Sequence, residues 1–296
     1  MKTNNNSNLS TNSFANTLRA DFYKLGKMKS VYIGAAIMFA LILISFAVFW
    51  LQVADANKVA DDAEREAAVA AVMANAHSNL FSFASLINLE LMTAIIIGIF
   101  VGKDFSNGTM RLAIARGASR MQMYFSKFIV VAVLLAGYML GALLICGVFT
   151  AIEGYGTPAF DGLQFARLMR TFALSYVALL SSGSIFLMIA FLTRSSGAAL
   201  GASLGFYILI GVVVSIVSVR FAIVSIIGEI GGDDEALQQD KLYQALSYIP
   251  MQQLSYCISD KPMKVADAMK LLFMPIAYTL LSSFVGIFTF IKRDVK

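Results

Sequence analysis

The chain has 296 residues, of which 58% are hydrophobic and only 14% are charged, and its formal net charge is +5 at pH 7. With a mean hydropathy of +0.74, so much apolar surface cannot be buried in one soluble core of this size. The composition therefore excludes a soluble globular protein and indicates a polytopic membrane protein.

Residues 1–30 are predicted to form a cytoplasmic tail followed by a short amphipathic helix. The first 12 residues, MKTNNNSNLSTN, lack the apolar middle and cleavage site of a secretory signal. From residue 13 to 30, apolar residues recur at helical spacing and basic residues occupy the other face. The apolar set is Phe14, Leu18, Phe22 and Leu25, and the basic set is Arg19, Lys24, Lys27 and Lys29. This pattern predicts a helix on the inner membrane face; a simple basic flank of the first span is the alternative.

Six apolar stretches are each about as long as the roughly 20 helical residues that cross a bilayer. They cover residues 31–51, 83–101, 128–149, 172–192, 196–219 and 271–291. The sequence has no alternating pattern of ten-residue membrane strands, and backbone groups that face lipid must be hydrogen-bonded internally. We therefore predict an all-α transmembrane domain of six helices over residues 31–296.

The distribution of Lys and Arg along the chain predicts the orientation of these spans. The segments placed in the cytoplasm hold 14 Lys or Arg residues and three carboxylates, whereas the outer segments hold nine and 14. Lys and Arg are enriched in cytoplasmic loops of membrane proteins, so both termini are predicted to be cytoplasmic. Because topology accounts for the net positive charge, a nucleic-acid partner is not expected.

Residues 220–256, between the fifth and sixth spans, are predicted to form short helices at the outer face. The apolar run Phe221–Ile230 has only ten residues, which is too short to span a bilayer. A second short helix is expected over Glu235–Tyr248, before Pro250. Irregular backbone at membrane depth must be sheltered by protein or water, so this re-entrant or interfacial segment is predicted to line or cap a pathway.

The loop over residues 102–127 carries the most specific pattern in the chain. It holds five Lys or Arg residues and one carboxylate, Asp104. The run Gly108-Thr109-Met110-Arg111, followed by Arg116 and then Ser119-Arg120, resembles the membrane subunits of type-2 ATP-binding-cassette (ABC-2) exporters. In that family a GT-leucine-arginine element and a serine-arginine element precede the third span. The six-span layout, the amphipathic lead-in helix and the short outer helices are similar as well.

The resemblance implies that residues 102–127 contain a coupling helix, which sits in a cleft on a separate ATPase subunit. The residues expected to serve this coupling are Asp104, Gly108, Thr109, Arg111, Arg116, Ser119 and Arg120. Arginines are suited to carboxylates and carbonyls of a partner, and Met110, Leu112, Ile114, Met121 and Met123 would supply apolar contacts. Alternatively, the arginines only follow the charge rule or bind anionic lipid headgroups.

The resemblance also implies a pseudo-symmetric or homodimeric permease in a bacterial plasma membrane. The partners expected are the ATPase subunit, a second copy or a homologous permease, and membrane lipid. The sequence lacks the phosphate-binding G-x-x-x-x-G-K-[ST] pattern, so ATP and Mg²⁺ are expected on the partner, with no cofactor in this chain. One His and two Cys residues predict neither a metal site nor a catalytic centre. We expect a non-catalytic subunit that exports an amphipathic or hydrophobic cargo, such as a peptide, bacteriocin or antibiotic.

Two further features lie within the predicted spans. Glu90 is the one carboxylate well inside a span, where a charge is unfavourable by roughly 2.5 to 3.5 kcal/mol. It either lines a transport path with Asn88 or pins helices together, and a secondary transporter or channel that uses Glu90 is the alternative function. Glycines at four-residue spacing predict close helix packing, and the set in the fifth span is expected near the central pathway: Gly197, Gly201 and Gly205.

Overall fold

The computed structural model describes residues 14–59, 61–81, 84–152, 162–231, 248–249, 253 and 265–292. This part of the chain is built from helices and contains no strand, as the sequence predicts. The helices are α1 (Phe14–Lys27), α2 (Lys29–Ala56), α3 (Asp62–Phe81), α4 (Ala84–Ser106), α5 (Thr109–Ala115), α6 (Arg120–Ile152), α7 (Gly162–Thr193), α8 (Ser196–Gly231) and α12 (Val265–Lys292).

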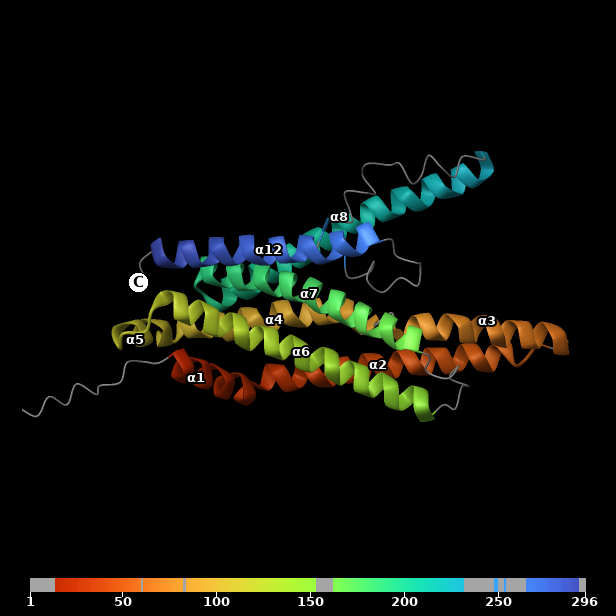
Figure 1. Cartoon of the computed structure of the whole chain (residues 1–296), viewed down its shortest axis with the longest axis horizontal. Helices are drawn as coiled ribbons and strands as arrows, with labels where there is room; N and C mark the ends of the chain where they lie inside the picture. Colours follow the sequence, from red (N-terminus) through yellow and green to blue (C-terminus); the bar gives the residue numbers. More distant parts are fainter. Residues whose placement is uncertain are drawn as a thin grey trace, which may run out of the picture.

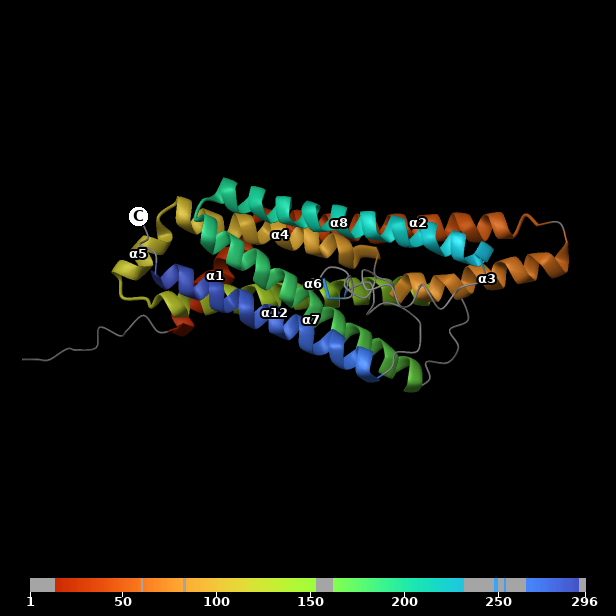
Figure 2. The same ribbon diagram turned by 90° about the horizontal axis from the view of Figure 1, so that it is seen from above.

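The long helices lie roughly along one axis, which makes the molecule long and narrow (Figure 1). One end holds α1, α5 and the last turn of α12, and the other end holds the turn between α2 and α3 (Figures 1 and 2). The first helix, α1, and the C-terminal end of the last helix, α12, therefore lie at the same end of the molecule as α5. The predicted topology requires a common side for α1 and the end of the sixth span.

Within the described residues, five helices are long and apolar enough to cross a membrane, by length and composition: Lys29–Ala56, Arg120–Ile145, Met169–Thr193, Ser196–Val217 and Met269–Lys292. They coincide with all the predicted spans except the second. That span coincides with α4, whose described side chains, residues 89–106, include the charged Glu90, Lys103 and Asp104. The chain is a multi-pass membrane protein, and its sixth crossing stays a prediction.

The inner helices of the array are α4 and α7, which together contact α2, α6, α8 and α12. On α4, the side chains of Ile96, Ile97, Phe100 and Val101 are all at most 1% exposed. By contrast α2, α8 and α12 turn apolar residues such as Leu280 outward. In a membrane protein such outward faces meet lipid, which is as apolar as the side chains themselves.

The helix α8 corrects one prediction. It continues without a break from Ser196 to Gly231, so Phe221–Ile230 is its C-terminal part and not a separate re-entrant helix. Only Arg220 separates this run from the span before it, and a single charged residue does not break the backbone ladder of a helix. The second predicted helix, Glu235–Tyr248, lies outside the described residues except for Tyr248 itself.

The predicted N-terminal helix is present as α1, but its apolar stripe packs on protein. Leu25 is buried, and Leu18 and Phe22 pack against the core of the helical array. Its main contact is with α6. Lys24, expected on a basic face towards lipid headgroups, instead reaches α4, where its ammonium donates to the carbonyl of Phe100 at 3.1 Å. The position of α1 at the membrane surface stays a prediction.

Candidate functional site

The loop between α4 and α6 folds into the short helix α5, with a glycine in left-handed conformation at each end. Gly108 is the N-cap residue, with φ of +70°, and Gly117 has φ of +92°. At the C-terminal end, the amide of Gly117 donates to Ile114 at 2.9 Å and that of Ala118 to Ala113 at 3.0 Å. This pair of bonds is a Schellman motif, which ends a helix sharply. Both ends of α5 are therefore fixed by backbone geometry that favours glycine.

Thr109 joins the first turn of α5 to the end of α4. Its hydroxyl oxygen lies 2.8 Å from Oδ1 of Asp104 and 3.0 Å from the backbone oxygen of the same residue. The predicted coupling residues Asp104, Gly108 and Thr109 thus form one corner of the chain. Their role in this structure is to set the direction in which α5 leaves α4.

Asp104 also belongs to a cluster of four charges, here called the charge cluster: the buried Asp21, Asp104 and Lys127 and the partly buried Lys24. The ammonium of Lys127 lies between the two carboxylates, contacting Oδ1 of Asp21 and lying 2.5 Å from Oδ2 of Asp104. The ammonium of Lys24 contacts Oδ1 of Asp104. Ser126 donates its hydroxyl proton to Oδ2 of Asp21 at 2.6 Å. Residues of α1, α4 and α6 therefore meet in one electrically balanced group.

The charge cluster is shielded from water. The side chains of Lys127 and Asp104 are 4% and 8% exposed, and that of Lys24 is 32% exposed. Burial by itself would raise the pKa of Asp104, but the charges of Lys127 and Lys24 outweigh it and hold that pKa below its ordinary value. Burial lowers the pKa of Lys24. Removing one partner from such a group leaves an uncompensated buried charge, so the cluster fixes α1 firmly to the roots of the loop.

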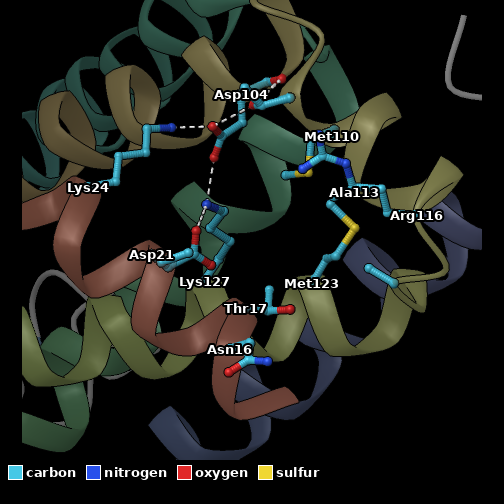
Figure 3. A pocket seen from close by; sticks show the side chains of 13 residues that line it. Asn16, Thr17, Asp21, Lys24, Asp104, Met110, Ala113, Arg116, Met123 and Lys127 are labelled. Atoms are coloured by element: carbon cyan, nitrogen blue, oxygen red, sulfur yellow. Dashed lines mark hydrogen bonds and ion pairs between the residues drawn. The ribbon is translucent and has the colours of Figure 1, made fainter. Parts of the chain in front are cut away.

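A half-open pocket of about 330 Å³ lies between α1 and α5, next to the charge cluster (Figure 3). Asn16 and Thr17 of α1 line one side, and Met110 and Arg116 of the loop line the other (Figure 3). The cluster closes its inner wall. The pocket therefore separates the N-terminal turns of α1 from α5, while the cluster holds the two helices together further in.

The serine-arginine element acts on helix ends. Ser119 is the residue before α6: its side-chain oxygen accepts from the amide of Gln122 at 3.2 Å, and the Gln122 side chain accepts from the amide of Ser119 at 3.4 Å. This reciprocal pair is a capping box. Arg120 donates to the carbonyls of Phe290 and Ile291 at 2.9 and 2.8 Å. Its guanidinium is thus directed towards the last turn of α12 inside the chain.

The solvent-facing side of the loop is smaller than the sequence suggests. Arg111, Leu112, Arg116 and Met121 are exposed, with Leu112 at 52% and Met121 at 51%. Met110 and Met123, predicted as apolar contacts for a partner, are 1% and 3% exposed because they pack into the core. Ile114 is partly buried in the same way. The exposed surface therefore combines two arginines with two flexible apolar side chains.

Glu90 lies elsewhere, about 21 Å along the axis of α4 from Asp104 at 1.5 Å per residue. It is 1% exposed, and its Oε1 accepts a hydrogen bond from the hydroxyl of Ser182 on α7 at 2.6 Å. The side chain of Asn88, predicted beside it on a transport path, lies outside the described residues. The observed contact joins two inner helices, as expected for a residue that pins α4 to α7.

The glycine pairs differ in what they face. A Cβ on Gly98 would lie 2.9 Å from Cα of Leu200, and one on Gly102 would lie 2.5 Å from Cα of Ser196, so α4 and α8 approach backbone to backbone. The close helix packing predicted from four-residue glycine spacing therefore occurs at this pair. At Gly197, Gly201 and Gly205, in contrast, a Cβ would meet no atom of the described chain within 4 Å. These glycines lie on an open face of α8.

Sequence reasoning missed that Asp21 and Lys127 are part of the site. A usable signal was present, because Asp21 is the single carboxylate among residues 1–30 and precedes Lys24 by three residues, on the same helix face. Asp104 is likewise the single carboxylate of its loop. Isolated carboxylates within basic segments are candidates for buried pairing.

Comparison with protein families gives a match to this chain. The family model described as "ABC-2 family transporter protein" matches residues 17–211, which is more than half of the chain. The matched segment begins in α1 and ends within α8. It therefore includes the charge cluster, α5, and the capping residues Gly108 and Ser119. A comparison with curated proteins finds no match.

Proposed function

Because the chain belongs to the ABC-2 family of transporter proteins, we propose that it is the transmembrane permease subunit of an ATP-driven exporter. A separate cytoplasmic ATPase subunit binds ATP and Mg²⁺ and drives export through residues 102–127. This chain is then non-catalytic. The cargo is an amphipathic or hydrophobic molecule, such as a peptide, bacteriocin or antibiotic, and it leaves through a bacterial plasma membrane.

The observation that carries this proposal is that residues 102–127 are both exposed and rigidly held. A surface that transmits a push must be exposed to its partner and stiff within its own chain. The exposed residues Arg111, Leu112 and Met121 meet the first requirement. Two glycine-fixed ends of α5 and the charge cluster beneath it meet the second. An arginine-bearing loop that only balanced lipid charge would not need to be fixed from three helices.

The remaining architecture follows from the same family membership. Six spans, with α4 as the second, place both termini in the cytoplasm beside the loop. A second copy of the chain or a homologous permease completes the transport unit. The open face of α8 with Gly197, Gly201 and Gly205 supports a close helix–helix contact with that second subunit. Export then proceeds when ATP closes the ATPase dimer and the loops of both subunits move.

The second candidate is a secondary transporter or channel that uses Glu90. Its supporting observation is a carboxylate that is 1% exposed at a position well inside α4. Intramembrane carboxylates often mark ion or proton pathways. The hydrogen bond from Ser182 also joins α4 to α7, so the burial of Glu90 agrees with a structural role as well as with a role in transport.

Co-purification from native membranes tests the main proposal. An ATPase subunit should be recovered with the unsubstituted protein and lost from the variant R111E/L112D, because both side chains are exposed on α5. The control is K58Q, which removes an exposed charge at the opposite end of the molecule and should retain the ATPase. If the folded, unsubstituted protein never carries an ATPase subunit, the exporter proposal fails and the secondary transporter is favoured.

A further inference from the structure

Arg120 connects the root of the loop to the cytoplasmic end of α12. Its Nη1 lies 2.9 Å from the carbonyl oxygen of Phe290 and 2.8 Å from that of Ile291. The last carbonyls of a helix have no intrahelical partner, and a cation near them is favoured by the helix dipole. The same guanidinium lies 5.9 Å from the ring centroid of Phe290. One side chain from the loop thus binds both the backbone and the ring at the end of α12.

An aromatic cluster beneath Arg120 makes this connection stiff. The ring of Phe290 lies 6.0 Å from that of Phe105, which precedes α5, and 4.9 Å from that of Phe191 on α7. Tyr124, in the first turns of α6, lies 4.9 Å from Phe191. A Cβ on Gly286 would lie 2.8 Å from Cε2 of Tyr124, so α12 and α6 are in close contact there. Residues on both sides of α5 therefore pack on the last turns of α12.

Away from this end, one face of α12 has no protein neighbour in the described chain. Leu280, Leu281 and Phe284 are 67%, 63% and 68% exposed. Its inner face is held by α7, for example through the contact of 2.7 Å between the hydroxyls of Ser184 and Ser282. The loop consequently reaches α12 only at the cytoplasmic end, within the described residues. That end is where a displacement of the loop would enter the helix.

We propose that Arg120 is a positioning residue that passes the displacement of the loop to α12, and not a contact for the ATPase subunit. This inference rests on the proposed function, because it needs an ATPase to move the loop. It divides the arginines of the loop into two tasks. Arg111, on the exposed side of α5, serves the partner, while Arg120 serves the sixth span.

Arg194 provides a matched control, because it binds a carbonyl in the same turn of α12 from another part of the chain. It lies in the α7–α8 connection, has φ of +55°, and its Nη2 donates to the carbonyl of Thr289 at 3.3 Å. Arg194 and Arg120 therefore both bind carbonyls at the end of α12, but only Arg120 belongs to the loop. Loss of either arginine should loosen the end of the helix, and only loss of Arg120 should also remove a polar connection between the helix and the loop.

Hydrogen–deuterium exchange of the complex with its co-purified ATPase tests this, with nucleotide-free complex compared with complex trapped by ATP and vanadate. In the unsubstituted protein, trapping should change exchange both in residues 102–127 and in the last turns of α12. In R120Q the change should persist in the loop and be clearly smaller in α12, where only the packing contacts of Phe105 and Tyr124 remain. In R194Q it should persist in both, and R120K, which retains a cation, should restore part of the α12 response.

The outcomes separate this inference from the proposed function. If R120Q keeps the full α12 response, Arg120 does not transmit the displacement and the inference is wrong. If R120Q loses the ATPase subunit while R194Q keeps it, Arg120 belongs to the docking surface, which overturns the inference and leaves the proposed function intact. If the unsubstituted complex contains an ATPase but its loop shows no response to trapping, the proposed drive through residues 102–127 fails, and this inference fails with it.

Discussion

The chain has buried carboxylates in two regions, and their partners differ: cations in one region and a hydroxyl in the other. At the end of the molecule that holds α5, Asp21 and Asp104 share Lys127, and Asp104 also binds Lys24, so the charges of the cluster cancel. Within α4, Glu90 has the hydroxyl of Ser182 as its hydrogen-bond partner. A balanced cluster needs all its members in place and therefore acts as a rigid joint. A single carboxylate on a hydroxyl is a local contact between two helices. The two regions should respond to substitution on very different scales.

Replacement of Lys127 by methionine should have the largest effect. It removes the cation between Asp21 and Asp104 and leaves two buried carboxylates facing each other, which should cost about 3–5 kcal/mol of stability. Thermal unfolding of the detergent-solubilised protein would measure the loss. The control is K103M, because Lys103 lies in the same segment but is exposed. An equal effect of the two substitutions would contradict the role given to the cluster.

Acid should weaken the cluster next. Lys127 and Lys24 hold the folded-state pKa of Asp104 below its ordinary value, so the stabilisation is present above the unfolded pKa of about 4. As pH falls through the folded pKa, Asp104 is protonated and that contribution is lost. We therefore expect the stability difference between the unsubstituted protein and D104N to be constant from pH 7 to 5 and to shrink below about pH 4. A difference that grows on acidification would have the wrong sign.

The contact of Glu90 should give the smallest effect. The S182A substitution removes the hydrogen-bond donor to a buried carboxylate and should cost about 1–3 kcal/mol. In an E90Q background the same substitution should cost less, because a neutral amide has a smaller need for that donor. A double-mutant cycle of thermal unfolding measures the difference. If S182A destabilises the protein as much as K127M, the two regions are not distinguished by charge balance as we argue.

Much of the fold could be read from the sequence, because apolar length and charge distribution are local properties. Five predicted spans coincide with apolar helices, and the helix within residues 14–27 was found from its spacing. The prediction of a separate helix over residues 221–230 was wrong, since the length of an apolar run cannot distinguish a short helix from the continuation of a long one. In the loop, Gly108 and Ser119, which the sequence analysis assigned to coupling, lie at the N-terminal ends of α5 and α6 in the structure.

The contacts of individual side chains could not be predicted from the sequence. Asp104 and Arg120 look alike in sequence, as polar residues of one basic loop. In the structure Asp104 faces the buried cluster, and Arg120 faces the carbonyls of α12, which are 170 residues further along the chain. Met110 and Met123 are equally apolar to Met121, yet only Met121 is exposed. Which side of a short helix meets the core depends on neighbours that sequence spacing does not contain.

The sequence by itself determined that this is a multi-pass helical membrane protein with a basic loop at one end and no nucleotide-binding pattern of its own. Those features follow from composition and from the cost of exposing backbone to lipid, which act on each segment separately. The tertiary structure decided that Asp21, Lys24, Asp104 and Lys127 form one neutral joint and that Arg120 binds the end of α12. Ion pairs and helix caps between distant segments depend on distances of a few ångström, and only packing sets those distances.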